Sequence, residues 1–195
     1  FLATEDQRFL EHHGVDFYGL LRAATEVLLT GSKVQGGSTI TMQVARNFYL
    51  SREKTFLRKF TEILLSLKIE REFTKEQILE LYLNKIFLGN RAYGVAAAAQ
   101  VYFNKTLNQL TLPEMATIAG LPKAPSAINP LINPIAAKQR RDHVLTRMFE
   151  LGYISKASYE TAIATPMLTQ VQTDTGGMIK APYVAEMVRD MMYKS

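Results

Sequence analysis

The chain has 195 residues, of which 47% are hydrophobic and 21% charged, values typical of a folded globular domain rather than a disordered or collagen-like chain. It contains no cysteine, which excludes a disulfide framework, a thiolate nucleophile and a cysteine-bound metal. Its 23 basic side chains against 18 acidic ones give a net charge of +5, which favours an anionic partner such as nucleic acid, phosphate or an acidic membrane surface.

The N-terminal segment places two carboxylates side by side. Glu5 and Asp6 stand just before a stretch that we predict to be helical, where acidic side chains commonly interact with the helix dipole and have no other role. His12 and His13 follow. Neighbouring histidines point apart and no third ligand is near, so hydrogen-bonded structural histidines are favoured over a metal site. A further helix is predicted over residues 16–30.

A glycine pair followed by two hydroxyl side chains marks the next helix start. Ser38 and Thr39 are ordinary N-cap residues, and the free backbone N–H groups at such a start also suit phosphate oxygens. The Gly-Lys-Ser/Thr sequence of a nucleotide-hydrolysing P-loop is absent. From this start, three polar side chains share one helical face: Gln43, Arg46 and Asn47.

The basic excess is concentrated in residues 46–59, where five basic side chains against one acidic one give a local net charge of +4. These cations are Arg46, Arg52, Lys54, Arg58 and Lys59. A cluster of this kind favours a site for a compact anion, and a solvated basic face is the plainer alternative.

A helix predicted over residues 55–70 carries an apolar stripe on one side and Arg58, Lys59 and Glu62 on the other. A surface ion pair of little energetic weight is one interpretation of these three residues. Leu65 and Ile69 share the side of Glu62, however. We therefore expect this side to border another lobe, a cleft or a lipid surface.

Helix signals dominate the rest of the chain. Thr74 and Gln77 form a capping box before an apolar run at 78–88, which predicts a buried helix that stops at Gly89. Three further starts are predicted from a capping box at Thr111 and Glu114, from Asn133 before a helix over 135–151, and from Ser155. We expect irregular connections at 31–37, 89–94 and 122–133. The predicted fold class is mainly α.

No run of about 18 uncharged apolar residues occurs, so no transmembrane span is predicted within these boundaries. The sequence begins at Phe1 in structured sequence and ends at Ser195 without a tail. We expect residues 1–195 to be one domain of a longer chain.

Five blocks of residues, in this order along the chain, resemble the motifs of the glycosyltransferase (transglycosylase) domain of class A penicillin-binding proteins, the peptidoglycan polymerases that consume lipid II. The blocks are Glu5, Asp6, Phe9, His12 and Gly14; Gly36, Ser38, Thr39, Ile40, Thr41, Gln43 and Asn47; Arg58, Lys59 and Glu62; Lys75, Ile78, Leu79, Glu80, Tyr82, Leu83, Asn84 and Gly89; and Arg140, Arg141, Val144, Leu145 and Met148. Together they cover nearly the whole chain. Met42 and Arg46 depart from the pattern, standing where many members have glutamine and lysine.

The resemblance implies a role for each block. Glu5 would be the general base that activates the 4-hydroxyl of an incoming lipid II sugar. Glu62, the second carboxylate, would orient cations or help to hold a divalent ion, Mg or Mn. The pyrophosphate leaving group would be stabilised by Arg46, Lys54, Arg58 and Lys59. The residues expected to shape or line the site are Asp6, Phe9, His12, Ser38, Thr39, Gln43 and Asn47. The fourth and fifth blocks are expected to be scaffold, with Arg140 and Arg141 paired to acids.

The resemblance also implies a fold and a setting. The expected fold is a lysozyme-like helical head lobe with a smaller membrane-facing jaw lobe, the jaw within residues 17–75. Direct displacement would invert the anomeric carbon, giving β-1,4-linked glycan and undecaprenyl pyrophosphate. Expected partners are lipid II, the growing glycan strand, the membrane surface, phosphoglycolipid inhibitors such as moenomycin, and a transpeptidase domain in the longer chain. The expected location is the inner (cytoplasmic) membrane, with the domain on its periplasmic or outer face. No organic cofactor and no nucleic acid are expected.

Two other functions remain open at this stage. A lysozyme-like hydrolase or lytic transglycosylase would use Glu5 as an acid, although cleavage of a neutral glycosidic bond leaves the basic cluster without a task. A helical nucleic-acid-binding module would use residues 46–59, although it gives Glu5 no role and the chain carries no recognised nucleic-acid motif.

Overall fold

The computed structural model describes residues 1–21, 25, 37–49 and 56–167, and these residues are mainly helical. The α-helices are α1 (Leu2–Glu5), α3 (Ile40–Tyr49), α4 (Phe56–Glu72), α5 (Lys75–Lys85), α6 (Val95–Phe103), α7 (Leu112–Gly120), α8 (Pro134–Glu150) and α9 (Lys156–Ala164). Two 3-10 turns cover Leu107–Gln109 and Leu121–Lys123. Within these described residues, extended pairing is limited to one bridge between Phe87 and Tyr93. The mainly α prediction is confirmed.

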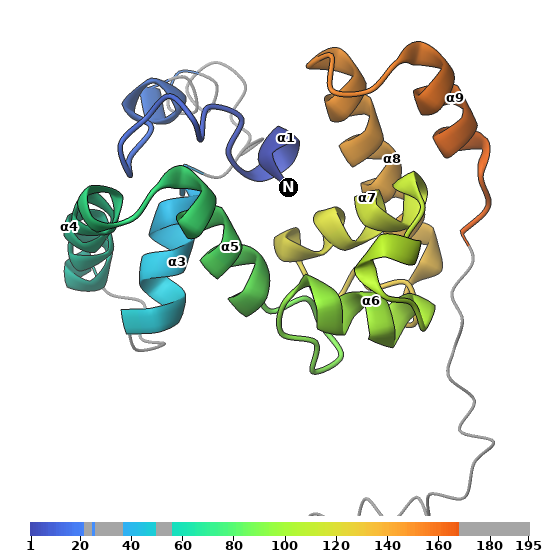
Figure 1. The fold of residues 1–195 in the computed structure, drawn as a ribbon, viewed down its shortest axis with the longest axis horizontal. Coiled ribbons are helices and arrows are strands. Elements are labelled where there is room, and N and C mark those ends of the chain that lie inside the picture. Colours follow the sequence, from blue (N-terminus) through green and yellow to red (C-terminus); the bar gives the residue numbers. More distant parts are fainter. Residues whose placement is uncertain (22–24, 26–36, 50–55, 168–195) are drawn as a thin grey trace, which may run out of the picture.

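The helices form two groups (Figure 1). Helices α3, α4 and α5 lie together on one side, α6 to α9 on the other, and the short α1 lies between them. The main core joins the groups, because Phe9 and Ile40 belong to the same buried cluster as Tyr102 and Ile118. A second cluster under α8 includes Leu145 and Ala162. The jaw within 17–75 stays a prediction, and part of that range lies outside the described residues.

The predicted helix starts are confirmed in their side-chain geometry. Gln77 and Thr74 exchange the two capping-box hydrogen bonds, with Gln77 Oε1 accepting from the Thr74 N–H at 2.9 Å. Glu114 does the same for Thr111 at 2.8 Å. Asn133 and Ser155 cap α8 and α9 by accepting backbone N–H groups. Each cap satisfies N–H groups that the first helical turn leaves without a partner.

The predicted end of helix α5 is wrong by three residues. Helix α5 ends at Lys85, because the chain turns at Ile86, whose carbonyl accepts from the Gly94 N–H at 2.8 Å. Gly89 does not stop a helix. It sits at φ +85° inside this turn, where a Cβ atom would lie 2.2 Å from the Pro125 carbonyl oxygen, so only glycine fits.

Two other elements differ from the prediction. Glu5 ends a short helix rather than preceding one, because Asp6 adopts φ −157° and breaks the helical path. Helix α6 was not predicted. It begins at Gly94, which offers no capping side chain, and its alanine-rich sequence gives no amphipathic period. Of the helix predicted over 16–30, residues 17–21 and 25 are helical and the others lie outside the described residues.

Helix α4 buries polar side chains and exposes apolar ones. Its side facing α3 buries Glu62 and Ser66, whereas the stripe of Leu57, Phe60 and Leu64 is 75%, 58% and 51% exposed. The prediction that the Glu62 side borders another part of the protein is confirmed. The apolar stripe does not enter the core of the described residues.

Candidate active site

Glu5 stands where the two helix groups meet. It is the last residue of α1, and its carboxylate is approached from both sides of the molecule. From α3, the Gln43 side-chain amide donates to Oε2 at 3.3 Å, and from α8 the Arg140 Nη2 lies 3.7 Å from Oε1. Both contacts are long for hydrogen bonds. The carboxylate is therefore held in place but loosely bonded.

Glu62 occupies a more enclosed environment on α4. Its side chain is 1% exposed, and Lys59 Nζ donates to Oε2 at 2.9 Å. Arg46 Nη1 approaches Oε1 at 3.6 Å, and Oε1 is a buried oxygen that accepts no hydrogen bond. Lys59 also donates to Ser38 Oγ at 2.9 Å. One carboxylate thus holds two cations, one from α3 and one from its own helix, beside the residues that precede α3.

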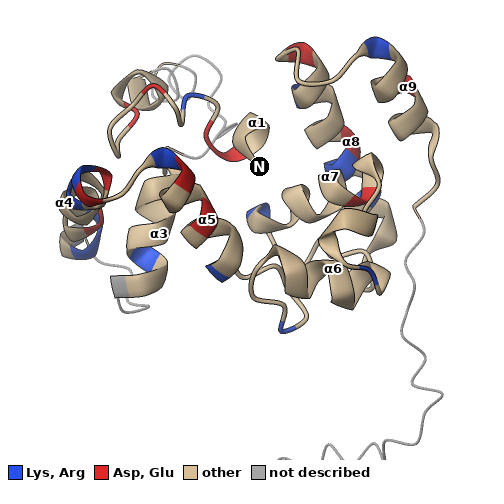
Figure 2. Ribbon diagram, viewed as in Figure 1, with Lys and Arg blue, Asp and Glu red and all other residues tan. Residues whose placement is uncertain are grey.

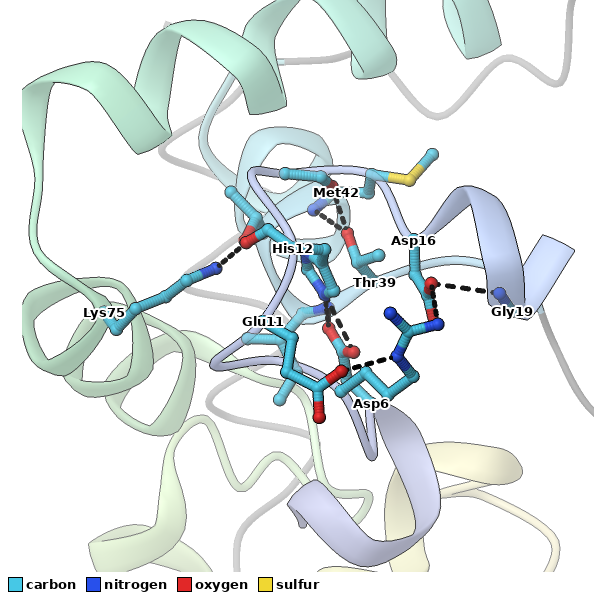
Figure 3. Close-up of polar contacts among 12 residues, drawn as sticks. Asp6, Glu11, His12, Asp16, Gly19, Thr39, Met42 and Lys75 are labelled. Atoms are coloured by element: carbon cyan, nitrogen blue, oxygen red, sulfur yellow. Dashed lines mark hydrogen bonds and ion pairs between the residues drawn. The ribbon is translucent and has the colours of Figure 1, made fainter.

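Asp6 and His12 form a buried pair that fixes the start of α3 (Figure 3). His12 Nε2 lies 2.9 and 3.0 Å from the two Asp6 oxygens, and the Ile40 N–H donates to Asp6 Oδ2 at 2.9 Å. Thr39 caps the helix by accepting the Met42 N–H. The interpretation of His12 as a hydrogen-bonded structural histidine is confirmed. The pair places Glu5, next to Asp6, beside the first turns of α3.

A second buried network holds the same loop and was not predicted. Lys75 Nζ donates to the His12 carbonyl at 2.6 Å and to Glu70 Oε1 at 2.7 Å, and Thr41 Oγ1 donates to the same glutamate oxygen at 2.6 Å. The Lys75 ammonium also lies 4.5 Å from the centre of the Phe9 ring, which is itself buried. Figure 3 shows Lys75 reaching the His12 backbone. Phe9 is therefore a core residue under the site rather than part of an exposed lining.

The remaining predicted residues are less closely tied to the carboxylates. Asn47 is exposed on α3, and Arg58 is half-buried on α4 beside Lys59. Lys54 lies outside the described residues. The structure brings together the cations Arg46 and Lys59 with Glu62.

Arg140 lies at the candidate site, although its block was expected to be scaffold. It was expected to be scaffold paired with an acid, and the acid proves to be Glu5. Burial lowers the pKa of the Arg140 guanidinium and the negative charge of Glu5 partly offsets this. An arginine remains a cation under such shifts. No local pattern connects residues so far apart in the chain, and the only signal was the Arg140-Arg141 pair itself.

The residues around Glu62 do not fit a divalent ion held by the protein. In the described part of the chain, no three acidic or histidine side chains gather in a way that could hold a metal. The neighbours of Glu62 are instead Lys59 and Arg46, whose positive charges oppose a bound cation. The expected Mg or Mn dependence stays a prediction, and we derive no step from it.

The arrangement combines one loosely bonded carboxylate with a cation cluster held by a second carboxylate. Figure 2 shows basic and acidic residues interspersed along α4 and α5, whereas α3 carries a single charged residue, Arg46. A carboxylate such as Glu5 can accept a proton, and cations such as Arg46 and Lys59 can bind an anion without reorganising.

Comparison with known proteins identifies the family of this chain. The sequence profile of the Transglycosylase family matches residues 1–149. The chain belongs to the transglycosylase family. The resemblance carried by the five blocks is confirmed, and the transglycosylase match covers all the acidic and basic side chains described above, from Glu5 to Arg140.

Individual relatives agree with the family. The chain is 53% identical over 191 residues to penicillin-binding protein 1A of Pseudomonas aeruginosa and 55% identical over 193 residues to that of Escherichia coli, covering 98% and 99% of this chain. It spans 23% of the length of each of these two relatives. It is also 57% identical over 166 residues to a putative transglycosylase of Cupriavidus necator, covering 85% of this chain and 71% of that protein.

A solved structure resembles the transglycosylase fold seen here. The crystal structure of penicillin-binding protein 1A from Haemophilus influenzae matches 80% of this chain and 19% of its own, with 44% sequence identity and a TM-score of 0.55. Among the residues described here, none of the helices has the length and apolar character that a bilayer span requires.

Proposed function

We propose that this transglycosylase domain is a peptidoglycan glycosyltransferase that polymerises lipid II into β-1,4-linked glycan strands. The observation that carries the proposal is the unequal pair of carboxylates. Among the described residues Glu5 makes only long contacts, whereas Glu62 is buried and holds Lys59 and Arg46. Unequal surroundings give two carboxylates different tasks.

Glu5 is the proposed general base. It accepts the proton of the 4-hydroxyl of one lipid II sugar as that oxygen attacks the anomeric carbon of the growing strand. The new O4–C1 bond forms while the bond from C1 to the pyrophosphate oxygen breaks, and the electron pair leaves with undecaprenyl pyrophosphate. A single displacement of this kind inverts the anomeric carbon. Gln43 and Arg140 hold the carboxylate in position without occupying it with short hydrogen bonds.

The departing pyrophosphate is the proposed ligand of the basic residues. Lys59 and Arg46 are already gathered by Glu62, so their charges need little reorganisation when the leaving group becomes more negative. Ser38 accepts a hydrogen bond from Lys59, and the half-buried Arg58 precedes Lys59 on α4. Lys54 remains a proposed member of this set.

The exposed apolar stripe of α4 supports a membrane setting. Leu57, Phe60 and Leu64 are spaced i, i+3 and i+7, so they form one exposed apolar face. A lipid-linked substrate would bring that face to the bilayer surface. We propose location at the inner membrane with the domain on the periplasmic or outer face, a transpeptidase domain in the longer protein, and inhibition by phosphoglycolipids such as moenomycin.

Incubation with purified lipid II tests the proposal. We expect a glycan polymer that a muramidase digests, and we expect Glu5→Gln to abolish polymerisation because the amide cannot accept the proton. Circular dichroism and thermal melting should show that this variant is folded. Glu11→Gln is the matched control, since Glu11 is an exposed partner of Arg8 on the same segment and should leave turnover unchanged.

Three results would contradict the proposal. Near-normal turnover by Glu5→Gln would remove Glu5 as the base. Cleavage of preformed glycan by the wild-type protein, without polymer formation from lipid II, would support the lysozyme-like hydrolase instead. Salt-sensitive binding of DNA or RNA without either reaction would support the nucleic-acid module.

A further inference from the structure

One buried hydroxyl in the described core has no hydrogen-bond partner. Tyr82, on α5, is 0% exposed, and its phenol oxygen makes no hydrogen bond. Buried hydroxyl groups are normally paired, and an unpaired one destabilises the fold relative to a satisfied group. A phenylalanine would fill the same space without this loss. The retained hydroxyl therefore calls for a reason other than packing.

The surroundings of Tyr82 place that hydroxyl under the proposed site. Its ring packs edge-on against Phe1, with ring centroids 5.9 Å apart, and the Phe1 carbonyl accepts the Glu5 N–H in the single turn of α1. Tyr82 also belongs to the same buried cluster as Ile40 and Val44 of α3, the helix that supplies Gln43 and Arg46.

Charged groups of the site act on the phenol. Burial raises the pKa of Tyr82 far above its usual value, the negative charge of Glu5 raises it further, Arg46 lowers it and Asp6 raises it. The hydroxyl therefore keeps its proton and can act as a donor. Asp6 already accepts from His12 and Ile40, whereas the contacts of Glu5 with the described residues are the two long ones.

We propose that Tyr82 is a positioning residue for the general base: its buried hydroxyl is a reserved hydrogen-bond donor for the Glu5 carboxylate. The proposal rests on the proposed function, because it assigns the hydroxyl a task in the same reaction. When the acceptor sugar draws Glu5 away from Gln43 or Arg140, the phenol supplies the replacement donor and keeps the carboxylate ionised and aligned. Asp6 and Arg46 are the other charged groups whose electrostatic effect reaches the phenol.

The test compares two buried tyrosines that differ in one respect. Tyr102 is also 0% exposed, but its hydroxyl donates to the Leu88 carbonyl at 2.8 Å. We expect Tyr102→Phe to lower the melting temperature and leave the pH–rate profile unchanged. We expect Tyr82→Phe to keep or raise the melting temperature, to lower kcat by about 10- to 100-fold, and to change KM by less than about threefold.

Two further measurements distinguish positioning from packing. Loss of a donor to an ionised carboxylate makes its protonation easier, so the acidic limb of the pH–rate profile should move to higher pH in Tyr82→Phe. The rise in melting temperature that saturating lipid II produces should also be smaller in Tyr82→Phe than in the wild-type protein, and Tyr82→Phe should make no such difference in the Glu5→Gln background. This coupling needs no turnover, so it tests the proposal even if the protein fails to polymerise lipid II.

Each contrary outcome overturns the proposal. An unchanged kcat and pH–rate profile in Tyr82→Phe would show that the hydroxyl has no part in the reaction. A fall in melting temperature as large as that of Tyr102→Phe would show a structural hydroxyl. Additive effects of Tyr82→Phe and Glu5→Gln on the melting shift produced by lipid II would show that the two groups do not interact.

Discussion

Helices α4 and α8 have the same length, 17 residues, but they bury opposite kinds of side chain. Helix α8 buries Val144 and Leu145 and presents charged side chains such as Lys138 to solvent. Helix α4 buries Glu62 and exposes Leu57, Phe60 and Leu64. The first pattern is that of a helix whose apolar face forms the core. The second is that of a helix whose protein-facing side carries charged groups of the candidate site and whose apolar side is exposed.

The charged residue that each helix buries shows the same difference. Glu62 and Arg141 are both 1% exposed. Arg141 donates to the backbone carbonyls of Thr165 and Ile163 and pairs with Asp142, so it ties the end of α9 to α8. Glu62 holds side-chain cations and leaves one oxygen without a hydrogen bond. Burial alone therefore does not reveal whether a charge serves structure or function, whereas its partners do.

The largest expected effect separates these two buried charges. Glu62→Gln should lower polymerisation by at least about 100-fold, because the amide no longer holds Lys59 and Arg46 for the pyrophosphate. Arg141→Met should instead lower the free energy of unfolding by about 3–5 kcal/mol through its lost buried partners. Lipid II turnover and denaturant unfolding of both variants measure the two effects. Glu72→Gln, an exposed change on the same helix as Glu62, is the control and should alter neither quantity.

Retained turnover by Glu62→Gln would make Glu62 a second structural charge. An Arg141→Met variant as stable as the wild-type protein would contradict the structural role of Arg141.

A smaller effect concerns the apolar faces. Leu145→Ala on α8 should cost about 2–5 kcal/mol of unfolding free energy because it leaves a cavity in a fully buried cluster. Leu64→Ala on α4 should cost less than about 0.5 kcal/mol, since half of that side chain is already exposed. Urea unfolding checks both values.

Vesicle flotation should rank the same two variants in the reverse order. Leu64→Ala, alone or with Phe60→Ser, should weaken binding to lipid vesicles, and Leu145→Ala should not affect the bound fraction of folded protein. Equal vesicle binding by wild-type and α4 variants would contradict the membrane role of the stripe.

The smallest effect is a pH dependence of stability in the group formed by α6 to α9. Burial on its own would raise the pKa of Glu114, but hydrogen bonds from Lys105 and Thr111 outweigh it and hold the pKa below its usual value. A lowered folded-state pKa adds stability above the unfolded value of about 4.5 and loses it as the pH falls through the folded value.

Glu114→Gln should therefore cost about 1 kcal/mol at pH 7, and the difference from the wild-type protein should shrink as the pH falls below 4.5. Melting curves from pH 3 to 7 measure this. A difference that stays constant over that range would show that the ionised carboxylate contributes nothing to the cap. Turnover at pH 7 should be unchanged, in contrast to Glu62→Gln.

Local sequence alone determined the helix starts and the residues of the site blocks. Thr74, Thr111, Asn133 and Ser155 were predictable as caps because a side chain and the N–H groups it accepts lie within three residues of each other. The i, i+3 pairing of Lys59 with Glu62 was predictable for the same reason. The five blocks gave the family without any coordinates.

Only the tertiary structure decided which way the helices face and which distant groups meet. The apolar stripe of α4 could have joined the core, the plainer expectation, or met a lipid surface until its exposure was known. Arg140 meets Glu5, and Lys75 meets the His12 carbonyl, across more than 60 residues of chain. The same holds for the unpaired hydroxyl of Tyr82. Helical periodicity fixes which residues share a face, but it carries no information about what that face packs against.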